Sequence, residues 1–331
     1  MLAFLGLVGI GLLFKFGVVT KESVVGLGKD VLGTVSSVKV EERGSLEDRF
    51  LVAARTLLDR AKNSILRSIS KSLGTENEAA GQTREFAFAV VADSHEDSVY
   101  FPRILEKVKN LETDFLIHLG DLSNSGGLDK LGQAKTFLDD SEVDYYVIPG
   151  DHDYNWVPDH DLRNFKTVFG EPAYKSFSYD NISFIFLDNS DLEFGLSAQQ
   201  EKWLEETLMD VKREGAETIL VFTHVPLYND NGFFPDKVMG KHSSSGVVEE
   251  QRQRLLGLFE DFEVDYIFSG DVHYFSQYFE PETKLKMVTV GAGCGGDCMN
   301  TLPQFAIVTV YKDGKIEIVP KPYKELEEIQ K

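Results

Sequence analysis

The spacing of apolar residues along the chain changes near residue 85. Beyond this point, short apolar runs typical of strands occur at 86–91, 115–118, 145–148, 182–187, 218–222 and 266–269. Stretches with apolar residues at helical spacing lie between several of these runs: 100–108, 197–212 and 248–259. Three further strand-like stretches follow without intervening helices: 284–290, 304–311 and 315–319. This alternation predicts a layered α/β domain with a β-rich final part.

The first nineteen residues are apolar except for Lys15. Such a stretch is long enough for a marginal membrane span if Lys15 extends toward the membrane surface. A buried or docking helix is the alternative. Because Lys21 and Lys29 follow the apolar stretch, the positive-inside rule favours the cytoplasmic side for the rest of the chain. We therefore expect membrane association through residues 1–20.

Residues 45–72 repeat apolar side chains at helical spacing and carry basic side chains between them. A basic amphipathic helix of this kind can lie on an acidic membrane surface, but packing against the domain that follows is favoured. The expected domains are a hydrophobic segment, a helical and linker region, the α/β domain and a C-terminal tail: 1–20, 21–84, 85–320 and 321–331.

The charge is unevenly distributed between these regions. The chain has 34 Lys and Arg against 54 Asp and Glu, a formal charge of −20, and residues 1–84 contribute 12 basic and 9 acidic residues. The acidic excess therefore belongs wholly to the later region, which disfavours nucleic acid as a ligand. The hydrophobic content of 42% excludes a disordered chain and a multi-span membrane protein. The two cysteines, Cys294 and Cys298, form either free thiols or one small disulfide loop.

Aspartate and histidine follow five of the strand-like runs. The strings are Asp93-Ser94-His95, Gly120-Asp121, Gly150-Asp151-His152-Asp153, Thr223-His224 and Gly270-Asp271-Val272-His273. Ligands gather at the carboxyl ends of strands in α/β sheets, and imidazole and carboxylate bind Mn, Fe and Zn. The groups exceed the needs of one ion, so the pattern predicts a pair of metal ions suited to phosphoryl displacement.

These motifs, in this order, resemble those of the calcineurin-like metallophosphoesterases, in the branch that includes the purple acid phosphatases. The family pattern is Asp-x-His, Gly-Asp, Gly-Asn-His-Asp/Glu, a lone His and Gly-His-x-His, and the resemblance covers residues 86–319. It implies a β-sandwich of two sheets flanked by helices. It also implies hydrolysis of a small phosphomonoester or phosphodiester by a hydroxide that bridges two metal ions.

The resemblance implies a role for each motif residue. The first metal ion would be held by Asp93, His95, His273 and the bridging Asp121. His224 would bind the second ion. His152 would stabilise the phosphate charge or protonate the leaving group, and Asp153 would orient His152.

Two positions depart from the family pattern. Asp151 stands where Asn is usual, and Asp271 stands where the first His of Gly-His-x-His is usual. We expect both to bind the second metal ion. Because the site would then be rich in carboxylates, we expect Mn or Fe at the first position and Mn, Fe, Mg or Ca at the second. The alternative is a catalytically weakened, membrane-associated binding module on the same fold.

Three more polar residues are candidates for the surroundings of this site. Asn124 would bind a phosphate oxygen or cap the following helix, and the cap is favoured. His242 lies in a long polar loop, 228–246, which we expect to form a wall of the substrate site. His118 lies within a strand-like run and is expected to be a core histidine or to support the metal ligands without binding a metal ion itself.

Overall fold

The computed structural model describes most of the chain beyond residue 82. The described residues are 83–111, 113–155, 161–230, 236–241, 243, 246–295 and 303–323. The expected membrane segment and amphipathic helix lie outside them, as do residues 324–331 of the expected C-terminal tail, 321–331. The last strand continues to Pro322, inside this expected tail. Across these described ranges, no helix is both long and apolar enough to cross a membrane.

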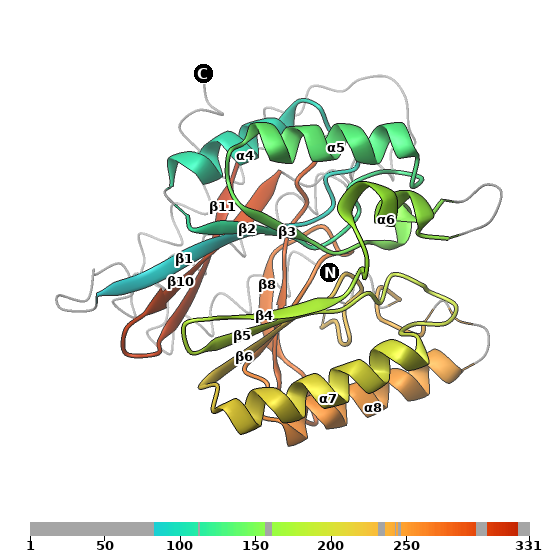
Figure 1. Cartoon of the computed structure of the whole chain (residues 1–331), viewed down its shortest axis with the longest axis vertical. Coiled ribbons are helices and arrows are strands. Elements are labelled where there is room, and N and C mark those ends of the chain that lie inside the picture. Colours follow the sequence, from blue (N-terminus) through green and yellow to red (C-terminus); the bar gives the residue numbers. More distant parts are fainter. Residues whose placement is uncertain are drawn as a thin grey trace, which may run out of the picture. The chain divides into compact units, whose positions relative to one another are not determined.

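The first sheet has five strands in the order β11-β10-β1-β2-β3 (Figure 1). Its parallel part is β1 (Arg84–Val91), β2 (Phe115–His118) and β3 (Tyr145–Val147). Its antiparallel part is β10 (Gln304–Tyr311) and β11 (Ile316–Pro322). The outer face packs against α4 (Tyr100–Asn110), α5 (Leu128–Asp140) and α6 (Arg163–Phe169).

The second sheet has six strands in the order β4-β5-β6-β7-β9-β8. Its four central, parallel strands are β5 (Ile182–Phe186), β6 (Thr218–Phe222), β7 (Tyr266–Ser269) and β9 (Lys286–Thr289). Its antiparallel edges are β4 (Lys175–Tyr179) and β8 (Ser276–Phe279). Its outer face packs against α7 (Ala198–Glu214) and α8 (Val247–Asp261). A short 3₁₀ helix, η1 (Asp151–Asp153), follows β3.

Strand β1 shows why its sequence is apolar at nearly every position. Phe86 and Phe88 point into the core between the sheets, whereas Ala89 and Val91 pack under the helices of the first sheet. Both faces of a strand must be apolar when both are covered. Between the sheets, the rings of Phe88 and Phe184 pack edge to face, with their centres 5.3 Å apart. The two-sheet fold flanked by helices, implied by the motif resemblance, is confirmed.

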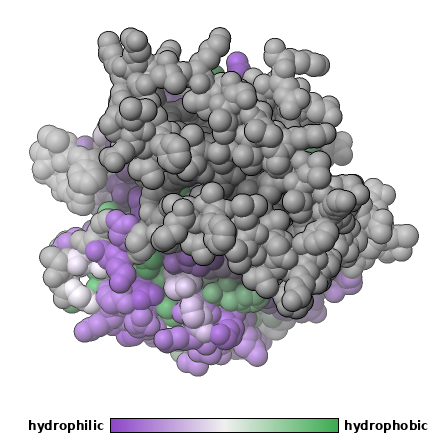
Figure 2. Space-filling model, turned by 180° about the vertical axis from the view of Figure 1, so that it is seen from behind, coloured by the Kyte–Doolittle hydropathy of each residue, from purple (hydrophilic) through white to green (hydrophobic). Residues whose placement is uncertain are grey.

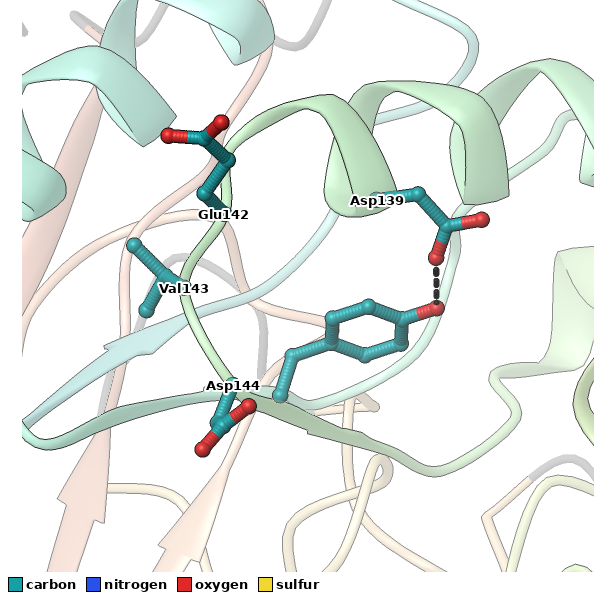
Figure 3. Close-up of a pocket in the computed structure, with 5 residues that line it drawn as sticks. Asp139, Glu142, Val143 and Asp144 are labelled. Atoms are coloured by element: carbon teal, nitrogen blue, oxygen red, sulfur yellow. Dashed lines mark hydrogen bonds between the residues drawn. The ribbon is translucent and has the colours of Figure 1, made fainter.

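Figure 2 shows one face of the molecule. The part of this face that described residues form is mainly hydrophilic, with smaller hydrophobic areas. A separate surface pocket is lined by Asp139, Glu142, Val143, Asp144 and Tyr145 (Figure 3). It opens where the chain enters β3, whereas the predicted metal ligands follow the other end of this strand. Two of its acidic groups have partners: the Tyr145 hydroxyl donates to Asp139 at 2.6 Å, and Glu142 forms an ion pair with Lys109. We assign this pocket no chemical role.

Two loops that carry predicted ligands pack together through glycine. A Cβ on Gly150 would lie 2.1 Å from Oδ1 of Asp121, and one on Gly120 would lie 2.5 Å from the nitrogen of Gly150. Gly120 also has a backbone φ of 92°, a conformation that residues other than glycine rarely adopt. Glycine at both positions therefore lets the loops after β2 and β3 approach closely enough to place Asp121.

Gly150→Ala should displace the Asp121 carboxylate, because the new methyl group would overlap its oxygen. We expect destabilisation of about 1–3 kcal/mol, typical of overpacking, together with weaker binding of Mn²⁺. Urea unfolding and calorimetric titration with Mn²⁺ measure the two effects. Gly132→Ala, in α5, is the matched control because its Cβ meets no atom within 4 Å. Wild-type stability and metal binding in Gly150→Ala would contradict this account of the packing.

Candidate metal centre

Four side chains from the loops after β1, β2 and β7 form the first ligand group. It consists of Asp93, His95, Asp121 and His273, whose ligand atoms all lie within 4.8 Å of one another. Nε2 of His95 lies 3.4 Å from Nε2 of His273 and 3.5 Å from Oδ2 of Asp121. Nε2 of His273 lies 3.7 Å from Oδ1 of Asp93. Both sheets therefore contribute to one small cluster.

The second ligand group consists of Asp121, Asp151 and His224. Nδ1 of His224 donates to the carbonyl oxygen of Leu119 at 2.6 Å. Burial opposes protonation of His224, but the carboxylates of Asp121 and Asp151 outweigh it and raise the pKa of this ring. A bound cation would take the place of the proton on Nε2, which lies 3.3 Å from Oδ1 of Asp121 and 3.1 Å from Oδ1 of Asp151. Asp121 thus directs one oxygen toward each group.

The donor atoms fit divalent metal ions. Oδ2 of Asp93 is buried and has no hydrogen-bond partner among the described residues, an unfavourable state that a cation would relieve. Burial lowers the pKa of His95, and burial together with His95 lowers the pKa of His273 to about 3, so both rings are neutral and can donate lone pairs. Burial opposes ionisation of Asp121, but the charge and the hydrogen bond of the His224 ring outweigh it and hold the pKa of Asp121 below its usual value.

The backbone is unusual at these positions. Left-handed φ angles of 44° to 62° occur at Asp93, His95, Asp121, Asp271 and His273. Residues other than glycine seldom adopt this conformation, and such strain concentrates at functional sites. Backbone hydrogen bonds between the loops stabilise this conformation. The nitrogen of Asp93 donates to the carbonyl oxygen of Gly120 at 3.0 Å, and the nitrogen of His95 donates to the backbone carbonyl oxygen of Asp121 at 2.9 Å.

His152 lies beside both groups and faces the solvent. Its side chain is 41% exposed, and its ring centre is 5.0 Å from that of His95. Nδ1 of His152 lies 3.2 Å from the carbonyl oxygen of Asn124. Because a carbonyl only accepts, this contact places a proton on Nδ1 and leaves Nε2 directed elsewhere, 3.9 Å from Oδ2 of Asp151.

The structure corrects the expected role of Asp153. Its carboxylate is buried and accepts from the backbone N–H groups of Leu122, Ser123 and Gly150 at 2.9–3.2 Å. Burial and the nearby Asp121 raise its pKa to about 7, while these N–H groups lower it. Asp153 therefore joins the loops after β2 and β3. The contact that orients the His152 ring comes from Asn124 instead.

The helix-cap interpretation of Asn124 is wrong. Helix α5 begins at Leu128 and its N-cap is Gly127. The Asn124 side chain is exposed and donates to the carbonyl oxygen of His95 at 3.3 Å. Asn124 thus connects the loop of His95 with the ring of His152, and its binding to phosphate stays a prediction.

Two other residues that the sequence singled out, His118 and Cys294, belong to neither ligand group. His118 is a buried core histidine whose Nε2 lies 3.0 Å from the hydroxyl of Ser94, as expected. Cys294 is disulfide-bonded. His242 and Cys298 lie outside the described residues.

Asp271 lies beside the two groups but belongs to neither. Its backbone nitrogen donates to Oδ1 of Asp93 at 3.1 Å, and its own carboxylate forms an ion pair with Lys237. Binding of a metal ion by Asp271 stays a prediction. Nothing in the sequence pattern singled out Lys237, although it lies in the polar loop that was expected to border the substrate.

Asn189 is a second residue that sequence reasoning missed. It is buried, and its Oδ1 accepts from the nitrogens of His224 at 3.0 Å and Val225 at 3.1 Å. Its Nδ2 donates to the carbonyl oxygen of Val225 at 2.7 Å. Asn189 therefore fixes the loop that carries His224. Its position just after β5 was a usable signal, because the other site residues also follow strands.

Residues 86–275 match the family model described as calcineurin-like phosphoesterase. Purple acid phosphatase 22 of Arabidopsis thaliana is 24% identical over 205 residues, 58% of this chain and 45% of its own length. A 3',5'-cyclic-nucleotide phosphodiesterase of Nostoc sp. is 28% identical over 232 residues, 66% of this chain and 83% of its own length.

Solved structures share the fold. A purple acid phosphatase from yellow lupin seeds aligns with a TM-score of 0.53 and 16% identity, over 74% of this chain and 55% of that one. PhoD aligns with a TM-score of 0.51 and 13% identity, over 70% of this chain and 65% of that one. The matched region thus spans about half the length of the Arabidopsis and lupin phosphatases. The family resemblance predicted from the motifs is confirmed.

Mn²⁺ should stabilise the protein through the two ligand groups. At a free concentration about 100-fold above its Kd, an ion that binds only the folded state raises the free energy of unfolding by about 2.7 kcal/mol. Asp121→Asn should abolish most of this gain, because Asp121 belongs to both groups. Urea unfolding with and without Mn²⁺ measures it. Asp188→Asn is the matched control, because the Asp188 carboxylate accepts a hydrogen bond from the Ser190 hydroxyl and belongs to neither ligand group. Equal stabilisation of both variants would contradict the assignment.

Proposed function

This chain belongs to the calcineurin-like phosphoesterase family, and we propose that it is a metal-dependent phosphoric ester hydrolase acting on small phosphoesters. The observation that carries the proposal is the geometry of the two ligand groups, which share Asp121 and lie beside the exposed ring of His152. The acidic excess of the domain supports a small substrate rather than nucleic acid.

Two metal ions would be held by residues already described. The first group would be Asp93, His95, Asp121 and His273, and the second Asp121, Asp151 and His224. Bound divalent ions at such a site polarise phosphoryl oxygens and lower the pKa of water. The second group offers two carboxylates and one imidazole, a donor set that suits Mn, Fe or Mg.

His152 is the proposed proton donor. The Asn124 carbonyl holds its Nδ1, so the exposed ring can present Nε2 to a bound ester. When both ring nitrogens are protonated, the Nε2 proton can stabilise a phosphoryl oxygen or pass to the departing alkoxide. Asn124 would act through His152 by holding its ring orientation.

Both ester classes are supported by relatives. The Arabidopsis relative is named a phosphatase, and the Nostoc relative a 3',5'-cyclic-nucleotide phosphodiesterase. We therefore propose that aryl phosphates and 3',5'-cyclic nucleotides are the first substrates to test. A weakened binding module on the same fold would bind two metal ions but hydrolyse neither class.

His152→Ala should lower kcat for an aryl phosphate by about 10²–10⁴-fold, the usual contribution of a general acid. The metal content should not change, because His152 belongs to neither ligand group. Steady-state kinetics in Mn²⁺ and elemental analysis measure the two quantities. Asp188→Asn, whose carboxylate accepts a hydrogen bond from Ser190 and belongs to neither ligand group, is the control. Wild-type kcat in His152→Ala would remove His152 from the mechanism.

We also propose that residues 1–20 associate the chain with a membrane, on the basis of their apolar sequence. Replacing Leu12 and Leu13 by Lys should move the full chain from the membrane fraction to the soluble fraction, since each Lys costs about 2.5–3.5 kcal/mol in a span. Cell fractionation measures the distribution, and Lys15→Arg is the charge-preserving control. An unchanged distribution in the double variant would refute the anchor.

A further inference from the structure

A lysine ammonium lies at the edge of the two ligand groups. Lys237 forms an ion pair with Oδ1 of Asp271, and the backbone nitrogen of Asp271 donates to Asp93 in the first group. Asp151 in the second group also interacts electrostatically with this ammonium. The positive charge therefore acts on both groups, although neither contains it.

The segment that carries Lys237 is held firmly. Met239 is buried in the core under α8, and its backbone nitrogen donates to Pro226 at 2.9 Å. Asn229, whose Oδ1 accepts from the Tyr274 hydroxyl at 3.0 Å, lies 3.5 Å from the carbonyl oxygen of Lys237. The Lys237 side chain itself is 23% exposed. Its ammonium is therefore fixed beside the centre and still accessible from solvent.

The ion pair also alters the charge of the centre. Four carboxylates lie close together: Asp93, Asp121, Asp151 and Asp271. With two divalent ions, all four would leave no net positive charge to attract a phosphate. The ammonium of Lys237 offsets the carboxylate of Asp271, so the remaining carboxylates leave the loaded centre positive.

We propose that Lys237 binds a phosphoryl oxygen of the substrate and that Asp271 positions Lys237 instead of binding a metal ion. This inference rests on the proposed phosphoesterase function. An ammonium has three N–H donors and Asp271 engages it on one side, which leaves donors for a phosphoryl oxygen. A point charge at this place favours the dianion of a phosphomonoester over the monoanion of a phosphodiester.

The test compares Lys237→Met, Lys237→Arg and Asp271→Asn in the full chain loaded with Mn²⁺. We expect Lys237→Met to bind inorganic phosphate about tenfold to hundredfold more weakly than wild type, as for the loss of a charged hydrogen bond. Its metal content should equal that of wild type. Lys237→Arg should recover part of the phosphate binding, and Asp271→Asn should weaken it while retaining both metal ions. Lys241→Met, on the same loop, is the matched control.

Calorimetric titration with phosphate and elemental analysis give these quantities without turnover. In turnover, Lys237→Met should raise KM for an aryl phosphate more than for a cyclic nucleotide. Loss of one metal ion from Asp271→Asn, or unchanged phosphate affinity in Lys237→Met, would overturn the inference. If wild type hydrolyses no ester while its phosphate affinity still depends on Lys237, the proposed function fails and the inference stands.

Discussion

The centre depends on a buried carboxylate, Asp121, whose two oxygens are directed toward different groups of ligands. A carboxylate in this position is held by loops that approach through Gly120 and Gly150, and its charge is stabilised by neighbouring imidazoles. Asp153 adds a second buried carboxylate, which accepts hydrogen bonds from backbone N–H groups of the same loops. The close packing of these loops therefore determines where the metal ligands can lie.

Much of the fold and of the ligand set could be predicted from the sequence. The strand-like runs were visible because both faces of the central strands are apolar, as in β1. Ligands such as Asp93 and His224 were recognisable because each follows a strand directly, and parallel strands bring their carboxyl ends to one edge. Local pattern and chain order were sufficient at these positions.

The contacts made by longer loops could not be predicted in this way. Lys237 meets Asp271 across a long sequence separation, and no periodic pattern marks it. Asp153 was expected to orient the neighbouring imidazole because the family motif places them together, but the 3₁₀ turn directs its carboxylate back to backbone N–H groups. Side-chain direction in such turns depends on tertiary contacts that local sequence does not encode.

The two sheets divide the ligands between them. Asp93 and Asp121 belong to loops of the first sheet, whereas His224 and His273 belong to loops of the second. Ions bound here would therefore cross-link the two halves of the sandwich at one edge, in addition to the aromatic core that joins them along their length. Sliding of one sheet over the other would then be resisted by coordination bonds, so mutations in the inter-sheet core far from the centre should appear first as altered metal affinity.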